Sequence, residues 1–397
     1  MAGIERRHAR LRFRTGAGGG RPASARSPAH HHPLRPRPRE RCRPESPGTP
    51  STMNPGSDEP QPVRLGLVGL KFGRWLLRAL TGIPGVTVTD LADRHADQKI
   101  LAGIAAPPAA RLHPDAEAMI REANIDAVIL ATSPLRRGPL LAACAARGLP
   151  VFVEKPWAGN PIQAREFAAL CAPIAERVMV GFSFRFHEPV QRLRALLDGP
   201  LGPAWLANGE YAFHWNLGPD GWLWDPQGGG GVFNENSCHL LDVVCHLMGR
   251  PAWVQAAAAN PRDMPGPELG AVVLGFPAGG IAAVTLGALG APAFDRYPRL
   301  DLIAARGRAS LIGRGHVWEA LEWAELDDHA RRRLDAPPEV LGFTRYTAAL
   351  EHFVTCVRSG ARPRASIEDG ILAVDLAHAL AASAQNGSRM ELPPPGA

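Results

Sequence analysis

The tripeptide Glu154-Lys155-Pro156 places a lysine where it can accept or donate a proton. The apolar run Val151–Val153 before it predicts a buried strand that ends at these residues. Arginine effectively keeps its proton, whereas a partly desolvated lysine beside a positive group can lose it. The chain uses arginine for nearly every basic position, and its only lysines are Lys71, Lys99 and Lys155. We therefore expect a catalytic lysine with a depressed pKa, oriented by Glu154. The alternative is a surface lysine in a salt bridge.

A second polar cluster, Asn-Glu-Asn-Ser-Cys-His-Leu-Leu-Asp, spans residues 234–242 and runs into a predicted helix at Cys238–Met248. His239 can hydrogen-bond a substrate hydroxyl or relay its proton. Asp242 lies three residues further on, on the same helix face, where it can orient the imidazole. A core histidine bonded to backbone is the alternative for His239.

The same helix repeats a Cys-His pair at a seven-residue interval, Cys238-His239 and Cys245-His246. Zinc sites on helices usually use i, i+4 spacing and take further ligands from elsewhere. We therefore expect no metal here.

A glycine-bearing turn follows the first predicted strand, Val63–Val68, and precedes a predicted helix at Arg74–Leu80. Its sequence is Gly69-Leu70-Lys71-Phe72-Gly73. Such a turn presents backbone N–H groups and the helix dipole to a pyrophosphate. Gly69 allows the tight turn and Gly73 the close helix–strand approach. Lys71 stands where the GxGxxG pattern has its second glycine, so it crowds the pyrophosphate or turns outward to pair with a phosphate. A tight turn without a ligand is an equal alternative.

Asp93 ends the second predicted strand, Val86–Ala92, 24 positions after Gly69. An acid at this place hydrogen-bonds the ribose hydroxyls and repels a 2′-phosphate, so it favours NAD over NADP. Arg94 beside it leaves NADP open. Thr132 and Ser133 follow another apolar strand, Ile125–Ala131, and are expected at the same ligand-binding edge of the sheet.

Strands alternate with helices up to about residue 182, which predicts a parallel sheet wrapped by helices. From 183 to 392 the pattern predicts an α+β domain with a mostly antiparallel sheet. Turn signals between the later strands predict hairpins. Two late helices, Thr344–Arg358 and Ile367–Ala384, complete this domain and can pack back on the first one.

Composition separates residues 1–60 from the rest. The first 52 residues hold twelve arginines and three glutamates, so they carry a formal charge of +9. Because the net charge of the whole chain is +6, the remaining residues carry −3. We expect a disordered basic extension, and no nucleic-acid binding by the folded part. No run of 18 apolar residues predicts a membrane span. Six cysteines without CxxC spacing suggest a reducing, cytoplasmic compartment.

Together these residues resemble the Gfo/Idh/MocA oxidoreductases, the glucose-fructose oxidoreductase and inositol dehydrogenase type. Glu154-Lys155-Pro156 is similar to their EKP motif, and the resemblance extends from Val63 to Leu392. Its other parts are Ala131–Pro134, Gly229–Gly231 before the His239 helix, and the C-terminal Gly360, Ile367–Gly370 and Ser383–Gly387.

The resemblance implies a Rossmann domain and NAD(P)-dependent hydride transfer to or from a polyol, sugar or related hydroxy or keto compound. It implies that Lys155 contacts both cofactor and substrate, and that His239 handles the proton with it. Inositol dehydrogenase-like members have an aspartate where this chain has Glu235. Arg185 borders the substrate cleft or forms a domain-interface ion pair. Asn236 and Asp242 belong to the substrate side.

One departure concerns Arg136 and Arg137, which stand where the family commonly has a histidine. With Lys71 they predict an unusually basic cofactor pocket. A redox-inactive, nucleotide- or sugar-phosphate-binding regulator is the alternative function, and a lyase-like enzyme that recycles a tightly held NAD is a third. The open sheet face predicts a homodimer or homotetramer.

Overall fold

The computed structural model describes residues 61–95, 107, 109–225, 228–328, 330–337 and 342–394. The expected extension at 1–60 and an expected helix at Ala96–Gly103 lie outside this part of the chain. Among the described helices, none is long and apolar enough to cross a membrane.

Six parallel strands form the first sheet, in the order β3-β2-β1-β4-β5-β6. They are β1 (Val63–Val68), β2 (Val86–Ala92), β3 (Arg111–His113), β4 (Ala127–Leu130), β5 (Val151–Val153) and β6 (Val178–Val180). The crossovers contain α1 (Leu70–Leu80), α3 (Ala116–Glu122), η1 (Pro134–Arg136), α4 (Arg137–Ala146), α5 (Pro161–Leu170) and η2 (Ala172–Arg177). The three strands β4, β5 and β6 are buried throughout, as their unbroken apolar runs require in a sheet covered on both faces. The predicted Rossmann fold is confirmed.

Nine strands form the second sheet, in the order β14-β13-β12-β11-β7-β10-β9-β8-β15. They are β7 (Ala204–Ala212), β8 (Trp253–Ala259), β9 (Leu269–Gly275), β10 (Ile281–Gly287), β11 (Arg299–Ala304), β12 (Gly307–Arg314), β13 (Val317–Glu325), β14 (Arg332–Asp335) and β15 (Met390–Glu391). Every neighbouring pair is antiparallel except β7 and β10. The predicted hairpin β9–β10 is present, and the turn signal after Ala305 lies at the turn between β11 and β12. Sequence reasoning does not predict the strands β12 to β14 themselves, because charged residues interrupt their apolar pattern.

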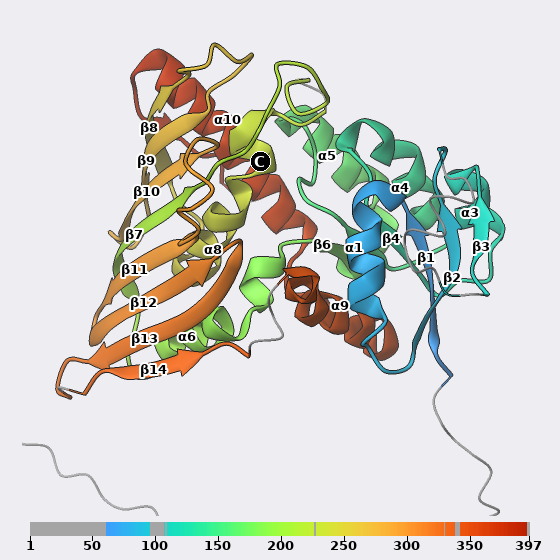
Figure 1. The fold of residues 1–397 in the computed structure, drawn as a ribbon, viewed down its shortest axis with the longest axis horizontal. Coiled ribbons are helices and arrows are strands. Elements are labelled where there is room, and N and C mark those ends of the chain that lie inside the picture. The colour runs from blue at the N-terminus through green and yellow to red at the C-terminus, as the bar shows by residue number, and fades with distance from the viewer. Residues whose placement is uncertain are drawn as a thin grey trace, which may run out of the picture. The chain divides into compact units, whose positions relative to one another are not determined.

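Helices cover one face of this second sheet (Figure 1). They are α6 (Glu188–Asp198), α8 (Cys238–Met248) and α10 (Ile367–Asn386). The strands alternate between buried and exposed residues, since only one face is covered. On the other face Leu206, Ile281 and Ile303 are exposed and lie side by side.

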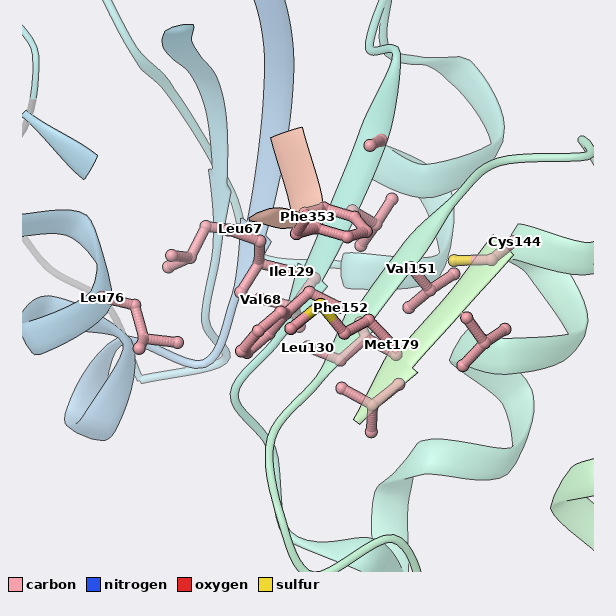
Figure 2. Packing of buried hydrophobic residues seen from close by; sticks show 14 of the residues in the cluster. Leu67, Val68, Leu76, Ile129, Leu130, Cys144, Val151, Phe152, Met179 and Phe353 are labelled. Carbon is pink, nitrogen blue, oxygen red and sulfur yellow. The ribbon is translucent and has the colours of Figure 1, made fainter. Parts of the chain in front are cut away.

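Two helices near the C-terminal end of the chain contact the cores of the sheets. The helix α9 (Thr347–Ser359) packs on the first sheet, where the Phe353 ring meets Phe152 of β5 edge-on at 5.8 Å (Figure 2). Along α10, Val374 belongs to the core of the first sheet and Leu380 to that of the second. Three short helical segments between the sheets carry site residues: η3 (Ser183–Phe186), α7 (Gly231–Glu235) and η5 (Gly342–Tyr346).

Candidate active site

Two glycines set the turn between β1 and α1. Gly69 has a φ of 90°, and a Cβ there would lie 2.6 Å from the carbonyl oxygen of Ala131. A Cβ at Gly73 would lie 2.8 Å from Leu67 Cδ2. These contacts give Gly69 the tight turn and Gly73 the close helix–strand approach that the sequence predicts.

The helix after this turn begins earlier than predicted. It starts at Leu70 instead of Arg74, because Gly69 is its N-cap. Lys71 and Phe72 therefore lie in the first helical turn. Lys71 is exposed to solvent, and Phe72 meets the Tyr346 ring edge-on at 5.7 Å. The first-turn N–H groups thus face the carboxyl edge of the sheet, where a helix N-terminus binds a phosphate.

Asp93 follows β2 and joins two backbone segments. Its Oδ2 accepts a hydrogen bond from Leu70 N at 2.8 Å, and its Oδ1 accepts one from His95 N at 2.9 Å. A carboxylate has about four acceptor positions, so two remain for a ligand's hydroxyl groups. The residues at this edge fit a dinucleotide.

The loop after β4 is fixed by a buried arginine. The guanidinium of Arg137 donates to the carbonyls of Thr132, Pro156 and Trp157, the last at 2.8 Å. Burial lowers the pKa of Arg137 to about 9. The prediction that Arg137 makes the cofactor pocket basic is wrong, because three backbone carbonyls hold its guanidinium inside the protein. Arg136 is exposed.

Three polar atoms near this loop are buried without a hydrogen-bond partner among the described residues: Thr132 Oγ1, Arg137 Nε and Glu154 Oε1. Buried polar groups in proteins are nearly always paired, so such atoms indicate an interaction with a ligand or water. Ser133 precedes η1 and makes no capping bond through its side chain.

The Lys155 side chain is held by Glu235. Its Nζ donates to Glu235 Oε1 at 2.6 Å and to the Glu235 carbonyl at 3.0 Å. The two side chains are only 11% and 14% exposed. Glu154 instead accepts from the Lys155 backbone N–H at 3.2 Å, so the expectation that Glu154 orients the lysine amine is wrong. The peptide bond between Lys155 and Pro156 is cis.

This pairing sets the charge of the lysine. Burial lowers the pKa of Lys155, but the Glu235 carboxylate, supported by Glu154, raises it by more, so the pKa lies above its ordinary value. The prediction that the pKa of Lys155 is depressed is therefore wrong for this arrangement, in which the amine is an ammonium ion. Burial raises the pKa of Glu154 to about 7.

His239 lies at the start of α8 and is enclosed by aromatic rings. Its ring stacks on Phe184 at 4.7 Å and meets the Tyr211 ring edge-on at 6.2 Å. Burial, followed by the positive charge of Lys155, holds the pKa of His239 well below its ordinary value. The imidazole is therefore neutral, and its buried Nδ1 has no hydrogen-bond partner among the described residues.

Arg185 and Asp242 form a buried ion pair. Arg185 Nε donates to Asp242 Oδ2 at 3.0 Å, and Arg185 Nη1 donates to Asp369 Oδ2 at 3.1 Å. Both partners in the first pair are 3% exposed. The prediction that Asp242 orients His239 is wrong, because Arg185 binds both of its carboxylate oxygens. The contacts of Arg185 therefore fit the second of its two predicted roles, an ion pair, and not a place at the border of the substrate site.

Asn236 is buried, and its Nδ2 has no hydrogen-bond partner within the described ranges. In the same ranges, no three His, Cys, Asp or Glu side chains are placed to hold a metal ion.

Sequence reasoning misses His316 and Arg345, whose charges also lower the pKa of His239. The hydroxyl of Tyr211 lies 2.7 Å from His316 Nδ1, and the His316 ring packs on Tyr297 and Phe213. The aromatic segment after residue 210 indicates the place of Tyr211. His316 lies in an unpredicted hairpin, and Arg345 is one arginine among many.

Comparisons with known proteins agree with this two-domain fold. Residues 63–182 match the oxidoreductase family with an NAD-binding Rossmann fold, and residues 190–310 match the GFO/IDH/MocA C-terminal domain. The chain belongs to the GFO/IDH/MocA family. It is an oxidoreductase whose first domain binds NAD.

Relatives of this GFO/IDH/MocA protein are dehydrogenases of sugars and polyols. It is 25% identical to D-apiose dehydrogenase of Paraburkholderia graminis, over 81% of this chain and 87% of the relative. It is 26% identical to inositol 2-dehydrogenase of Rhizobium meliloti, over 80% and 95%. Its fold is similar to that of levoglucosan dehydrogenase in complex with NADH and levoglucosan. The TM-score is 0.74 and the identity 18%, over 84% of this chain and all of that one.

Proposed function

We propose that this oxidoreductase transfers hydride between NAD and a secondary alcohol, or its ketone, on a polyol, sugar or related hydroxy compound. The observation that carries the proposal is the Lys155 amine, which Glu235 holds at 2.6 Å and whose charge acts on a neutral His239. The names of the relatives support this substrate class. NAD supplies the hydride acceptor or donor when it is bound.

The chain's own residues handle the proton. In the reducing direction the Lys155 ammonium donates a proton to the oxygen that was the carbonyl. In the oxidising direction the amine first loses its proton, and the negative charge of Glu235 opposes that loss. Neutral His239 hydrogen-bonds the same substrate oxygen and relays the proton.

The cofactor contacts proposed here are the first-turn N–H groups after Gly69, the Asp93 carboxylate and the loop at Thr132 and Ser133. Asp93 favours NAD over NADP because a carboxylate repels a 2′-phosphate. Asn236, with a free buried amide, is proposed to contact the substrate. We also propose a cytoplasmic location, on the basis of the free cysteines, and a homo-oligomer formed through the exposed apolar residues of the second sheet.

The test is a turnover assay with NAD⁺ and a panel of polyols and sugars, with NADH binding measured separately. We expect turnover in the wild type. Binding of NADH without turnover of any polyol, sugar or ketone would favour the regulator. Absence of binding to either nicotinamide cofactor would exclude the redox proposal.

A further inference from the structure

A connected aromatic group of the second domain packs beside His239, and we call it the aromatic wall: Tyr211, Phe213, Tyr297 and His316. Tyr211 is almost fully buried and hydrogen-bonds His316 at 2.7 Å. His316 has a φ of 71°, a conformation that non-glycine residues rarely adopt and that often occurs at functional sites. Burial, followed by the charge of Arg345, lowers the pKa of His316 to about 4, so this ring is neutral.

Arg345 is anchored against the same wall. Its carbonyl oxygen lies 3.1 Å from His187 Nε2, and His187 Nδ1 accepts from Trp318 N at 3.3 Å. Its guanidinium donates to Tyr346 Oη at 2.6 Å and lies 4.8 Å from the centre of that ring. The backbone and the side chain are therefore both positioned by protein contacts.

The positive charge of Arg345 is not neutralised by the described residues. None of their carboxylates lies within ion-pair distance of it, since Glu235 pairs with Lys155 and Asp242 pairs with Arg185. The charge nevertheless acts on the residues around His239. After burial, it is among the charges that lower the pKa of His239 and of His316. A cation that is positioned by protein contacts and has no counter-ion attracts an anionic ligand.

We propose that Arg345 binds a carboxylate of the substrate, so that the enzyme acts on an acidic sugar or hydroxy acid. The inference rests on the proposed function and narrows its substrate class. With Tyr211 donating to Nδ1, neutral His316 carries its hydrogen on Nε2 and adds a second donor on the same wall.

A phosphate group of the dinucleotide is the alternative anion for Arg345, because arginine binds carboxylates and phosphates in the same way. Tyr346 contacts Phe72 in the first turn of α1, which brings the Arg345 segment near the cofactor side. His187, whose Nε2 lies 3.1 Å from the Arg345 carbonyl oxygen, packs on Phe184, and Phe184 stacks on His239. This series of contacts favours the substrate side. The experiment therefore measures both affinities.

Matched pairs that differ only in the carboxylate provide the test: D-glucuronate with D-glucose, D-galacturonate with D-galactose, and L-tartrate with L-threitol. Each is titrated into the enzyme–NADH complex, and binding is followed by NADH fluorescence. We expect the wild type to bind the acid of at least one pair more tightly. In Arg345→Gln the affinity for that acid falls by about tenfold to a hundredfold, while NADH affinity is unchanged. Arg345→Lys keeps part of the preference.

Arg314→Gln is the matched control. It removes an arginine of the neighbouring hairpin that is half exposed and paired with Asp295 and Glu319. We expect it to keep the acid preference. Equal weakening of the acid and the neutral compound by Arg345→Gln would overturn the inference, as would weakened NADH binding or a wild-type preference for the neutral member of every pair.

Binding and turnover separate this inference from the proposed function. Turnover of neutral polyols, together with acid affinity that Arg345→Gln leaves unchanged, would refute the carboxylate site and keep the dehydrogenase. Acid binding that depends on Arg345, without any turnover, would keep the site and refute the dehydrogenase.

Discussion

The Nζ atom of Lys155 lies 2.6 Å from Oε1 of Glu235, and the two residues belong to different domains. Lys155 follows β5 of the Rossmann sheet, whereas Glu235 ends α7 in the second domain. The second domain therefore positions the amine that the first domain presents. The same contact keeps the amine protonated, so the Lys155–Glu235 pair links domain packing to the protonation state of the site.

Lys155→Met tests the role of the amine. The methionine keeps the apolar stem and removes the proton donor. We expect kcat to fall by about 10²- to 10⁴-fold, with NADH affinity close to that of the wild type. Steady-state kinetics and NADH titration measure the two effects. Lys155→Arg should also be inactive, because arginine keeps its charge but cannot exchange its proton. Substantial turnover by either variant would contradict the assignment.

Glu235→Gln tests how the lysine pKa is set. Glu235 raises the pKa of Lys155, so removing its charge lowers that pKa and produces the free amine at lower pH. We expect the rise of kcat with pH in the oxidising direction to move to lower pH. Glu235→Asp keeps the charge and serves as the control, with a profile close to that of the wild type. A profile that Glu235→Gln leaves unmoved would show that another group titrates.

Asp242→Asn leaves the Arg185 guanidinium buried without its main counter-ion. Removing one partner of a buried pair costs about 3–5 kcal/mol, so we expect a loss of this size in the free energy of unfolding. Denaturant titration measures it. Arg121→Ala breaks the exposed pair with Glu117 and should cost less than about 1 kcal/mol. If Asp242→Asn were no more destabilising than Arg121→Ala, the Arg185 pair would not be structural.

The buried His187 makes the free energy of unfolding depend on pH. Burial lowers its pKa from 6.5 to about 4, so the unfolded chain binds more protons than the folded chain between these values. The stability that neutral His187 provides is complete above pH 6.5 and is lost as the pH falls toward 4. We expect a contribution on the order of 2 kcal/mol to be lost between pH 7 and pH 5.

His187→Gln should reduce this acid sensitivity, measured as the change in unfolding free energy across that pH range. An unchanged pH dependence in His187→Gln would show that other groups dominate it.

Gly69→Ala tests the cofactor turn. The new Cβ would lie 2.6 Å from a backbone carbonyl oxygen, at a φ that disfavours alanine. We expect weaker NADH binding and a lower unfolding free energy. Gly148→Ala is the matched control, since Gly148 also has positive φ but its Cβ would meet no atom within 4 Å. It should show backbone strain of about 1 kcal/mol and normal NADH binding. Equal effects of the two variants on NADH binding would contradict the role of Gly69.

Local patterns in the sequence determine much of this protein. The apolar runs of β4 and β5, the glycines at 69 and 73, and the motif around Lys155 each depend on neighbouring residues, and they predict the Rossmann fold and the central lysine. The tertiary structure alone decides which charges meet. Lys155 pairs with a residue 80 positions away and Arg185 with one 57 positions away. The carbonyl of Arg345 likewise meets His187, which is 158 positions away. Ion pairing depends on distances in space and on burial, and sequence spacing encodes neither of these for residues so far apart.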